Sequence, residues 1–186
     1  MVTIYHSPMT RSCRVIWLAE ELGLDYELET FELFSAEMAA PEFLAVNPMA
    51  KVPALRDGDF VLWEPLAIME YLGARYSDGS LLPPRDTPLC ARTVQWMEFG
   101  ENQLTVLASE IVVHDGILPP ARTIPALIDR GRDELPKILA VVERALDGNT
   151  YIAGEQFTAA DIIMGFALPI AMHAGFLNDR TPGCRA

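Results

Sequence analysis

The residues best placed to take part in binding or catalysis lie where a predicted strand meets a predicted helix, within residues 47–76. Pro65 follows Glu64 and suits the first position of a helix, where proline is tolerated best. Val52–Pro53 begins a short apolar strand, at an entrance, edge or cis turn that needs no N–H from proline. The strand entrance and the helix N-terminus face one point, and helix N-termini attract negative charge. We expect an anionic small molecule to bind there.

A second group of reactive side chains surrounds the start of an earlier predicted helix: Ser7, Thr10, Ser12 and Cys13. A hydroxyl donates one hydrogen bond and accepts two, so Thr10 can cap the helix and also donate to a bound anion. Ser7, nearer the preceding strand, and Ser12, later in the turn, are alternatives. A helix N-terminus lowers the pKa of a thiol, so Cys13 is a candidate nucleophile, although a cysteine here more often points into the core.

The composition indicates a globular protein with a strongly acidic surface. Of 186 residues, 51% are apolar, and 26 acidic residues against 14 basic ones give a formal net charge of −12. Such a surface repels nucleic-acid phosphates and anionic lipid, so we expect neither nucleic acid nor a membrane as a partner. The apolar run 162–177 is shorter than the roughly 20 residues that cross a bilayer, and we interpret it as a buried helix.

The cysteines and histidines give no sign of a metal or redox centre. The three residues of each type are scattered, without metal-ligand or Cys-x-x-Cys spacing, so no metal is expected. Unpaired thiols are typical of reducing compartments, and the N-terminus lacks the basic stretch and apolar core of a secretory signal. We therefore expect a cytoplasmic protein.

Residues 1–77 alternate between strand and helix and predict one α/β domain. The two N-terminal strands should be parallel, because a short βαβ connection joins them. The order β-α-β-α-β-β-α is that of a thioredoxin-like domain. The expected strands cover 2–5, 26–33, 52–55 and 60–62, with a hairpin turn at 56–59, and the expected helices cover 11–22, an irregular 35–46 and 65–76.

Residues 78–88 are rich in proline, glycine, serine and aspartate and predict a linker to an all-helical domain over 89–186. Long helices are expected over 89–117 and 121–146, and Pro136 predicts a kink or a break in the second. Thr158 and Asp161 have the spacing of a capping box at the start of a third helix. No helix is predicted in the polar tail after residue 177.

These motifs together resemble the cytosolic glutathione S-transferases, in particular bacterial members of serine/threonine type. Val52–Pro53 matches the Val-cis-Pro of their third strand, and Thr10 occupies the hydroxyl position of a Ser-x-x-Cys-Arg pattern. Glu64 matches the first residue of the family's Glu-Ser pair, with Pro65 in place of serine. The Thr158 capping box matches the start of the family's core helix. The resemblance covers nearly the whole chain, with a shorter C-terminal domain.

The resemblance implies that glutathione is the co-substrate and that Thr10 holds its thiolate, as an orienting donor rather than a general base. Ser7 and Ser12 remain alternatives for this role. The backbone of Val52, next to a cis Pro53, would pair with the glutathione cysteine as a strand does.

The resemblance also implies how the charged ends of glutathione are held. Glu64 would pair with the γ-glutamyl ammonium, Lys51 would meet the glycyl carboxylate, and Arg11 would reach a carboxylate. Arg14 would form a structural ion pair instead. Pro65 lacks the hydroxyl and the N–H of the family's serine, and the N–H groups of the following two residues would have to compensate.

The implied reaction is a detoxification in which the glutathione thiolate adds to a small apolar electrophile. The electrophile would lie near Trp96, Asn102 and His114 of the long helix, and a homodimer is implied, paired through helices 65–76 and 89–117. The alternative is a non-catalytic interaction module that keeps the scaffold without the ligand site. The sequence leaves open conjugation, peroxide reduction, isomerisation and dehalogenation, and it does not identify the electrophile.

Overall fold

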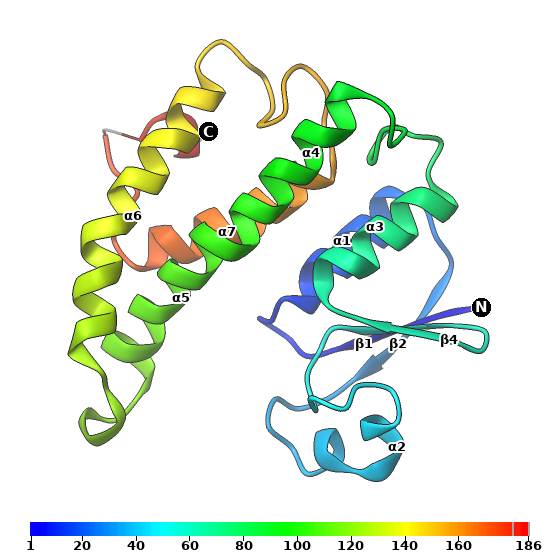
Figure 1. The fold of residues 1–186 in the computed structure, drawn as a ribbon. Helices are drawn as coiled ribbons and strands as arrows, with labels where there is room; N and C mark the ends of the chain where they lie inside the picture. The colour runs from blue at the N-terminus through cyan, green and yellow to red at the C-terminus, as the bar shows by residue number, and fades with distance from the viewer. Residues whose placement is uncertain (180, 186) are drawn as a thin grey trace. The chain divides into compact units, whose positions relative to one another are not determined.

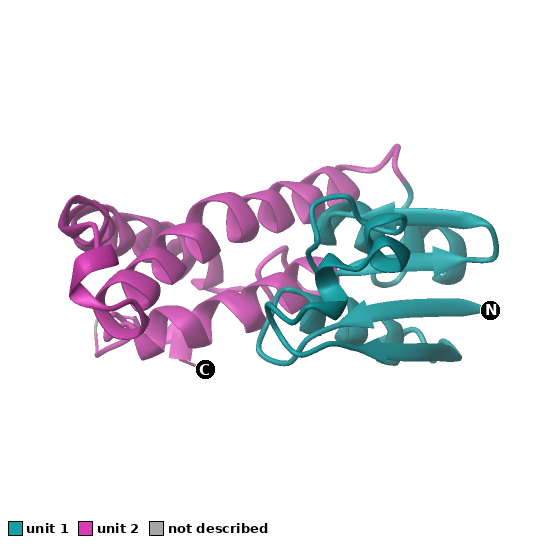
Figure 2. Cartoon of the chain, turned by 90° about the horizontal axis from the view of Figure 1, so that it is seen from below, with its two compact units in different colours: residues 1–84 teal, residues 85–186 magenta. Residues whose placement is uncertain are grey.

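The computed structural model describes residues 1–179 and 181–185, and the chain divides into two compact units, Met1–Pro84 and Arg85–Ala186 (Figure 2). The boundary falls inside the segment 78–88 that separates the alternating and the all-helical parts of the sequence.

Unit 1 is built on a four-stranded sheet with the order β2-β1-β3-β4 (Figure 1). Its strands are β1 (Val2–His6), β2 (Tyr26–Thr30), β3 (Ala54–Asp57) and β4 (Phe60–Trp63). β1 and β2 are parallel, while β3 is antiparallel to both β1 and β4. This arrangement confirms the predicted thioredoxin-like α/β fold.

Helices cover both faces of the sheet (Figure 1). Helices α1 (Ser12–Glu21) and α3 (Pro65–Tyr76) pack together on one face. The short helices η1 (Glu37–Ala39) and α2 (Pro41–Leu44) lie on the other, divided before Pro41 as predicted. The apolar spacing of α1 is explained by this packing, because Val15, Leu18 and Ala19 are fully buried.

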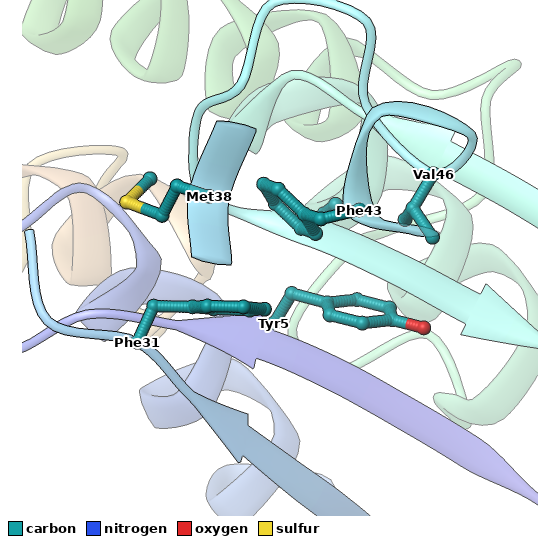
Figure 3. Packing of buried hydrophobic residues seen from close by; sticks show 6 residues of the cluster. Tyr5, Phe31, Met38, Phe43 and Val46 are labelled. Atoms are coloured by element: carbon teal, nitrogen blue, oxygen red, sulfur yellow. The ribbon is translucent and has the colours of Figure 1, made fainter. Parts of the chain in front are cut away.

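An aromatic cluster fills the space between α2 and the sheet (Figure 3). The rings of Phe31 and Phe43 lie 4.6 Å apart between centroids, and those of Tyr5 and Phe43 lie 5.6 Å apart. Val52 and Val61 pack against the same cluster. Aromatic pairs of this geometry stabilise by about 0.5–1.5 kcal/mol beyond their buried area. The cluster therefore fixes α2 and the chain that leads from it into β3.

Several strand ends differ from the sequence prediction. β1 and β4 each continue one residue further than predicted, and β3 begins at Ala54 rather than at residue 52. β2 ends at Thr30 rather than at residue 33, because the next side chain, Phe31, is buried in the aromatic cluster. β3 continues to Asp57, so the tight turn is Gly58–Asp59, with Gly58 at a φ of +60°. The Asp57 carboxylate accepts hydrogen bonds from the hydroxyls of Tyr71 and Tyr76, which tie this end of the hairpin to α3.

The helices and turns of unit 2 confirm the predicted all-helical domain, and its described residues form no strand beyond an isolated bridge between Tyr151 and Gly154. One helical run comprises α4 (Pro88–Phe99), the π-helical η2 (Gly100–Thr105), α5 (Val106–Val112) and the π-helical η3 (Val113–Ile117). The turn η4 (Pro120–Arg122) leads to α6 (Pro125–Leu146), and α7 (Ala159–His173) packs against α4, η2 and α5. No helix among the described residues is long and apolar enough to span a membrane.

Pro136 predicted a kink or a break in this helix, and the break is wrong. α6 runs from Pro125 to Leu146 without interruption and begins later than expected. Proline removes the donor to the carbonyl of residue 132, four positions earlier. Both Pro136 and Arg132 are exposed, so water can satisfy that carbonyl. The lost hydrogen bond therefore does not end the helix.

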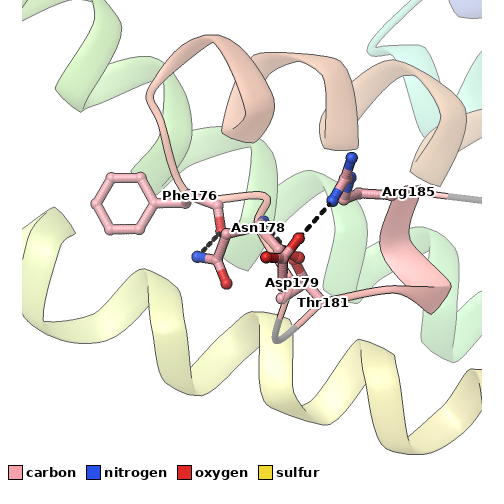
Figure 4. A network of polar contacts seen from close by, with 5 residues as sticks. All are labelled: Phe176, Asn178, Asp179, Thr181 and Arg185. Carbon is pink, nitrogen blue, oxygen red and sulfur yellow. Dashed lines mark hydrogen bonds and ion pairs between the residues drawn. The ribbon is translucent and has the colours of Figure 1, made fainter.

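The prediction of no helix after residue 177 is also wrong, because Gly183–Arg185 form a short 3-10 turn, η5. The Glu143 carboxylate accepts hydrogen bonds from the backbone N–H groups of Gly183 and Cys184 at 3.1 and 2.6 Å. Before this turn, the Thr181 hydroxyl accepts from the Asn178 N–H. Arg185, within the turn, donates to the Asp179 carboxylate (Figure 4). These contacts attach the C-terminal segment to α6 and to itself.

The capping box at the start of α7 is confirmed. The Asp161 carboxylate accepts from the Thr158 N–H at 2.8 Å, and the Thr158 hydroxyl accepts from the Ala160 N–H. The other carboxylate oxygen of Asp161 accepts from the Ile152 N–H at 2.9 Å. One side chain thus satisfies backbone donors from the helix start and from the preceding turn.

We predict that Asp161→Ala lowers the free energy of unfolding by about 1–3 kcal/mol, because two partly buried backbone donors lose their acceptor. Urea unfolding would show a lower midpoint with an unchanged slope. Asp133→Ala, which removes an exposed carboxylate from α6, is the control and should change stability little. Equal stability of Asp161→Ala and the wild type would contradict the structural role of the box.

Candidate functional site

The strand register brings three separate segments to one edge of the sheet. Tyr5 pairs with Ala54, and Ala54 pairs with Trp63. The loop after β1, the loop before β3 and the junction of β4 with α3 therefore lie next to one another. We call this region, residues 7–12, 47–53 and 64–67, the strand-end site. It contains every position for which the sequence predicts glutathione binding or thiolate stabilisation.

Three hydroxyl residues lie together in the first segment, but only Thr10 is accessible. Ser7 and Ser12 are 1% and 0% exposed, whereas Thr10 is partly exposed. The Thr10 hydroxyl donates to the Ser7 carbonyl at 2.7 Å and lies 2.6 Å from the Ser12 hydroxyl. A ligand at the surface could therefore contact the Thr10 hydroxyl and neither of the serines.

Capping of α1 does not account for Thr10. The Ser12 N–H donates to the Thr10 hydroxyl at 3.4 Å, a long hydrogen bond, and the N-cap residue, Arg11, has no side-chain cap. The shorter contacts of the Thr10 hydroxyl are those with Ser7 and Ser12. The geometry thus leaves a role for this hydroxyl beyond that of a helix cap.

The neighbouring charged and thiol groups differ in their access to the site. Arg14 is fully buried, and its Nε donates to the Arg11 carbonyl at 3.4 Å, which fits a structural role. Arg11 itself is partly exposed. Cys13 is a free, partly buried thiol on the first turn of α1.

The second segment is a tight loop held by Asn47, a residue that the sequence analysis did not single out. Asn47 is 3% exposed, and its amide donates to the Lys51 carbonyl at 2.6 Å and accepts from the Met49 N–H at 3.0 Å. The loop places Ala50 at a φ of +53°. The only sequence signal was its position before Pro48, which is common to many turns.

The Val52–Pro53 peptide bond is cis, as the motif predicted. Among residues 1–179 and 181–185, none forms a hydrogen bond with the backbone of Val52. Its N–H and C=O are therefore open to an extended ligand, as in the addition of a strand to a sheet edge. The adjacent Lys51 side chain is exposed.

The third segment joins β4 directly to α3. Glu64 is exposed and has a φ of +79°, a conformation that costs a residue other than glycine about 1–3 kcal/mol. Pro65 is buried at the first helical position. The first helical hydrogen bond runs from Ile68 N–H to the Glu64 carbonyl, so the N–H groups of Leu66 and Ala67 have no acceptor within α3.

A cavity of about 490 Å³ in unit 1 does not coincide with the strand-end site. It is lined by aromatic residues of the cluster under α2 and by charged residues that include Glu29 and Arg56. Its lining contains none of the predicted ligand-binding residues. The described residues also contain no cluster of metal-ligating side chains.

The residues predicted to lie near an electrophile all belong to unit 2 and have local partners. Trp96 is 7% exposed and packs edge-on against Phe99. The exposed Asn102 donates to Glu98, and the His114 ring accepts from the Ile124 N–H at 3.2 Å. His114 thus holds the turn before α6.

Comparison with known proteins identifies family models at both ends of the chain. The model "Glutathione S-transferase, N-terminal domain" matches residues 1–74, and "Glutathione S-transferase, C-terminal domain" matches residues 125–186. The first model spans all three segments of the strand-end site.

Relatives and solved structures match over most of the chain. Glutathione S-transferase 3 of Zea mays is 35% identical, with 85% of this chain and 72% of the relative covered. Glutathione S-transferase F14 of Arabidopsis thaliana is 34% identical, with 84% of this chain and 66% of the relative covered. The crystal structure of glutathione transferase F7 from Populus trichocarpa matches with a TM-score of 0.87 and 26% identity, covering 100% of this chain and 90% of that one.

A bacterial structure also matches. The theta class glutathione S-transferase from Xanthomonas axonopodis pv. citri, solved with glutathione bound, has a TM-score of 0.81 and 27% identity. The match covers 99% of this chain and 88% of that one.

We predict that Asn47→Ala lowers the free energy of unfolding by about 1–3 kcal/mol, because a backbone donor and a backbone acceptor of the loop lose their shared, buried partner. Urea unfolding followed by circular dichroism measures this change. Asn102→Ala, which removes an exposed amide from unit 2, is the control. If both variants were as stable as the wild type, Asn47 would not hold the loop.

Proposed function

The chain belongs to the glutathione S-transferase family, and on that basis we propose that it transfers glutathione, as its thiolate, to a small apolar electrophile. The observation that carries the proposal is the strand-end site. There the accessible Thr10 hydroxyl, the open Val52 backbone and the N-terminus of α3 lie at one edge of the sheet. Together these groups can bind the thiolate, the peptide backbone and a carboxylate of glutathione.

The Thr10 hydroxyl is the proposed hydrogen-bond donor to the glutathione thiolate. A free thiol has a pKa of about 8.5, so glutathione must be stabilised as the anion to react near pH 7. A hydrogen bond to a charged group contributes about 1.5–3 kcal/mol, which corresponds to a pKa lowered by about one to two units. To make this bond, the Thr10 hydrogen turns from the Ser7 carbonyl to the sulfur. Thr10 orients the thiolate and does not act as a base.

The remaining contacts follow the three parts of glutathione. The Val52 backbone pairs with the cysteine, beside Pro53, and Glu64 pairs with the γ-glutamyl ammonium. Lys51 and Arg11 meet the carboxylates. Pro65 supplies no donor, so the free N–H groups at the start of α3 replace it, as the hydrogen-bond pattern of that helix allows.

A non-catalytic interaction module is the second candidate, and it is favoured because Pro65 lacks hydrogen-bond donors. Pro65 is buried and carries neither a side-chain donor nor an N–H at the helix position nearest a bound anion. The loss of one or two hydrogen bonds would weaken glutathione binding by about one to three orders of magnitude. Under this proposal the scaffold persists without turnover.

We also infer a serine/threonine-type site, because the accessible group is the Thr10 hydroxyl. We expect the protein to form a homodimer in the cytoplasm. The free thiols of the described residues suit a reducing compartment. Conjugation in detoxification is the proposed reaction.

We predict that Thr10→Val lowers turnover of a generic electrophile by about tenfold to a hundredfold, because the thiolate loses a charge-assisted hydrogen bond. Thr10→Ser keeps the hydroxyl and should retain most of the activity. Thr30→Val, an exposed change at the end of β2, is the matched control. Full activity of Thr10→Val would contradict the assignment, and an inactive wild type that also binds no glutathione would favour the interaction module.

Glutathione binding measured by calorimetry tests the part played by Pro65. We predict that Pro65→Ser tightens binding by about tenfold or more, since it restores a hydroxyl and an N–H. Pro65→Ala restores the N–H alone and separates the two contributions. Micromolar to low millimolar binding by the wild type would support the enzyme. Binding by Pro65→Ser alone would support the module, and no gain in either variant would show that Pro65 does not limit the site.

A further inference from the structure

His6 lies next to Ser12, one of the three hydroxyl residues of the strand-end site, and it has no role in the proposed transfer. It is the last residue of β1 and is partly buried. Its Nδ1 lies 2.8 Å from the Ser12 hydroxyl oxygen, which in turn lies 2.6 Å from the Thr10 hydroxyl oxygen. A continuous chain of short polar contacts therefore leads from the imidazole ring to the accessible hydroxyl.

A count of hydrogens fixes the direction of this chain. Three short contacts join its four groups: His6 Nδ1 to Ser12 at 2.8 Å, Ser12 to Thr10 at 2.6 Å, and Thr10 to the Ser7 carbonyl at 2.7 Å. Each contact needs one hydrogen. The two hydroxyls supply two and the carbonyl supplies none. The third hydrogen must come from His6 Nδ1.

The opposite tautomer leaves a contact without a hydrogen. If His6 Nδ1 were an acceptor, Ser12 would donate to it, and Thr10 would have to donate to Ser12. The Thr10 oxygen would then lie 2.7 Å from the Ser7 carbonyl oxygen with no hydrogen between them. With Nδ1–H as the donor, the Ser12 oxygen accepts from His6 and from the Ser7 N–H and donates to Thr10, so all its capacity is used.

We propose that His6 is a positioning residue for the transferase reaction: its Nδ1–H directs the Ser12 hydroxyl toward Thr10 and so leaves the Thr10 hydrogen as the one that can turn to the thiolate. When glutathione binds, only this last hydrogen moves, from the Ser7 carbonyl to the sulfur. The Ser12 hydrogen stays on the Thr10 oxygen, and the Ser7 carbonyl gives up its Thr10 donor. Burial also lowers the pKa of His6, which keeps the ring neutral near pH 7. The inference rests on the proposed function.

The first experiment measures the pKa of the bound glutathione thiol from the ultraviolet absorbance of the thiolate over a pH series. We expect His6→Leu to raise this pKa by about one unit, which is tenfold less thiolate on the acidic side. His6→Asn presents an amide N–H near the position of Nδ1 and should recover much of the wild-type value. His173→Leu, at the exposed end of α7, is the matched control and should change nothing. An unchanged thiol pKa in His6→Leu would overturn the proposal.

Double substitution tests whether His6 acts through Ser12. Ser12→Ala interrupts the chain and should raise the thiol pKa as His6→Leu does. Because both variants break one chain, His6→Leu combined with Ser12→Ala should raise it no further than either alone. Additive effects would show that His6 acts by another route, and the positioning role would be wrong.

A measurement without glutathione separates this proposal from the proposed function. Nitrogen NMR of the free wild-type protein reports which ring nitrogen of His6 carries the hydrogen. We expect Nδ1–H in the wild type and loss of this preference in Ser12→Ala. An Nε2–H ring in the wild type overturns the inference even if the protein is an active transferase. An Nδ1–H ring in a protein that binds no glutathione supports the hydrogen-bond chain and refutes the transferase function alone.

Discussion

The register between β1 and β3 is the constraint on which the strand-end site depends. Pairing of Tyr5 with Ala54, and of Ala54 with Trp63, sets the loop after β1 beside the loop before β3 and the start of α3. A shift by one residue would turn every side chain of β3 to the other face, including the buried Leu55. The aromatic cluster resists such a shift, because Tyr5 and Ala54 are both part of it. Packing on one face of the sheet thus fixes the geometry at its edge.

Much of this architecture could be predicted from the sequence because local signals agree with the final packing. Pro65 at the first position of α3 and the box of Thr158 and Asp161 follow from local chemistry, and the cis bond before Pro53 follows from the family resemblance. Pro136 does not break α6, because a proline on the exposed side of a long helix leaves the unpaired carbonyl of Arg132 to water. The end of β2 was misplaced because burial of Phe31 is a tertiary effect that alternation along a strand does not reveal.

The polar details of the site could not be predicted, since they depend on contacts between segments or on exact distances. Ser7, Thr10 and Ser12 all carry a hydroxyl, and the structure adds the difference in burial that separates Thr10 from the two serines. Asn47 is one polar residue among several in a loop until its two hydrogen bonds are seen. His6 showed no spacing typical of catalysis, and its link to Thr10 runs through Ser12. Hydrophobic periodicity and turn residues predict the fold, whereas the direction of the hydrogen bonds between His6 and Thr10 depends on exact distances between atoms.

The two helix N-termini at the strand-end site are not equivalent donors for an anion. In the first turn of α1, the N–H of Ser12 meets the Thr10 hydroxyl, and those of Cys13 and Arg14 meet the Thr10 and Arg11 carbonyls. In α3, the free N–H groups of Leu66 and Ala67 remain available. A carboxylate can therefore be held by backbone at α3, while a thiolate near α1 depends on a side chain. Because the site has one accessible hydroxyl there, stabilisation of the thiolate rests on Thr10 and on the groups that direct its hydrogen.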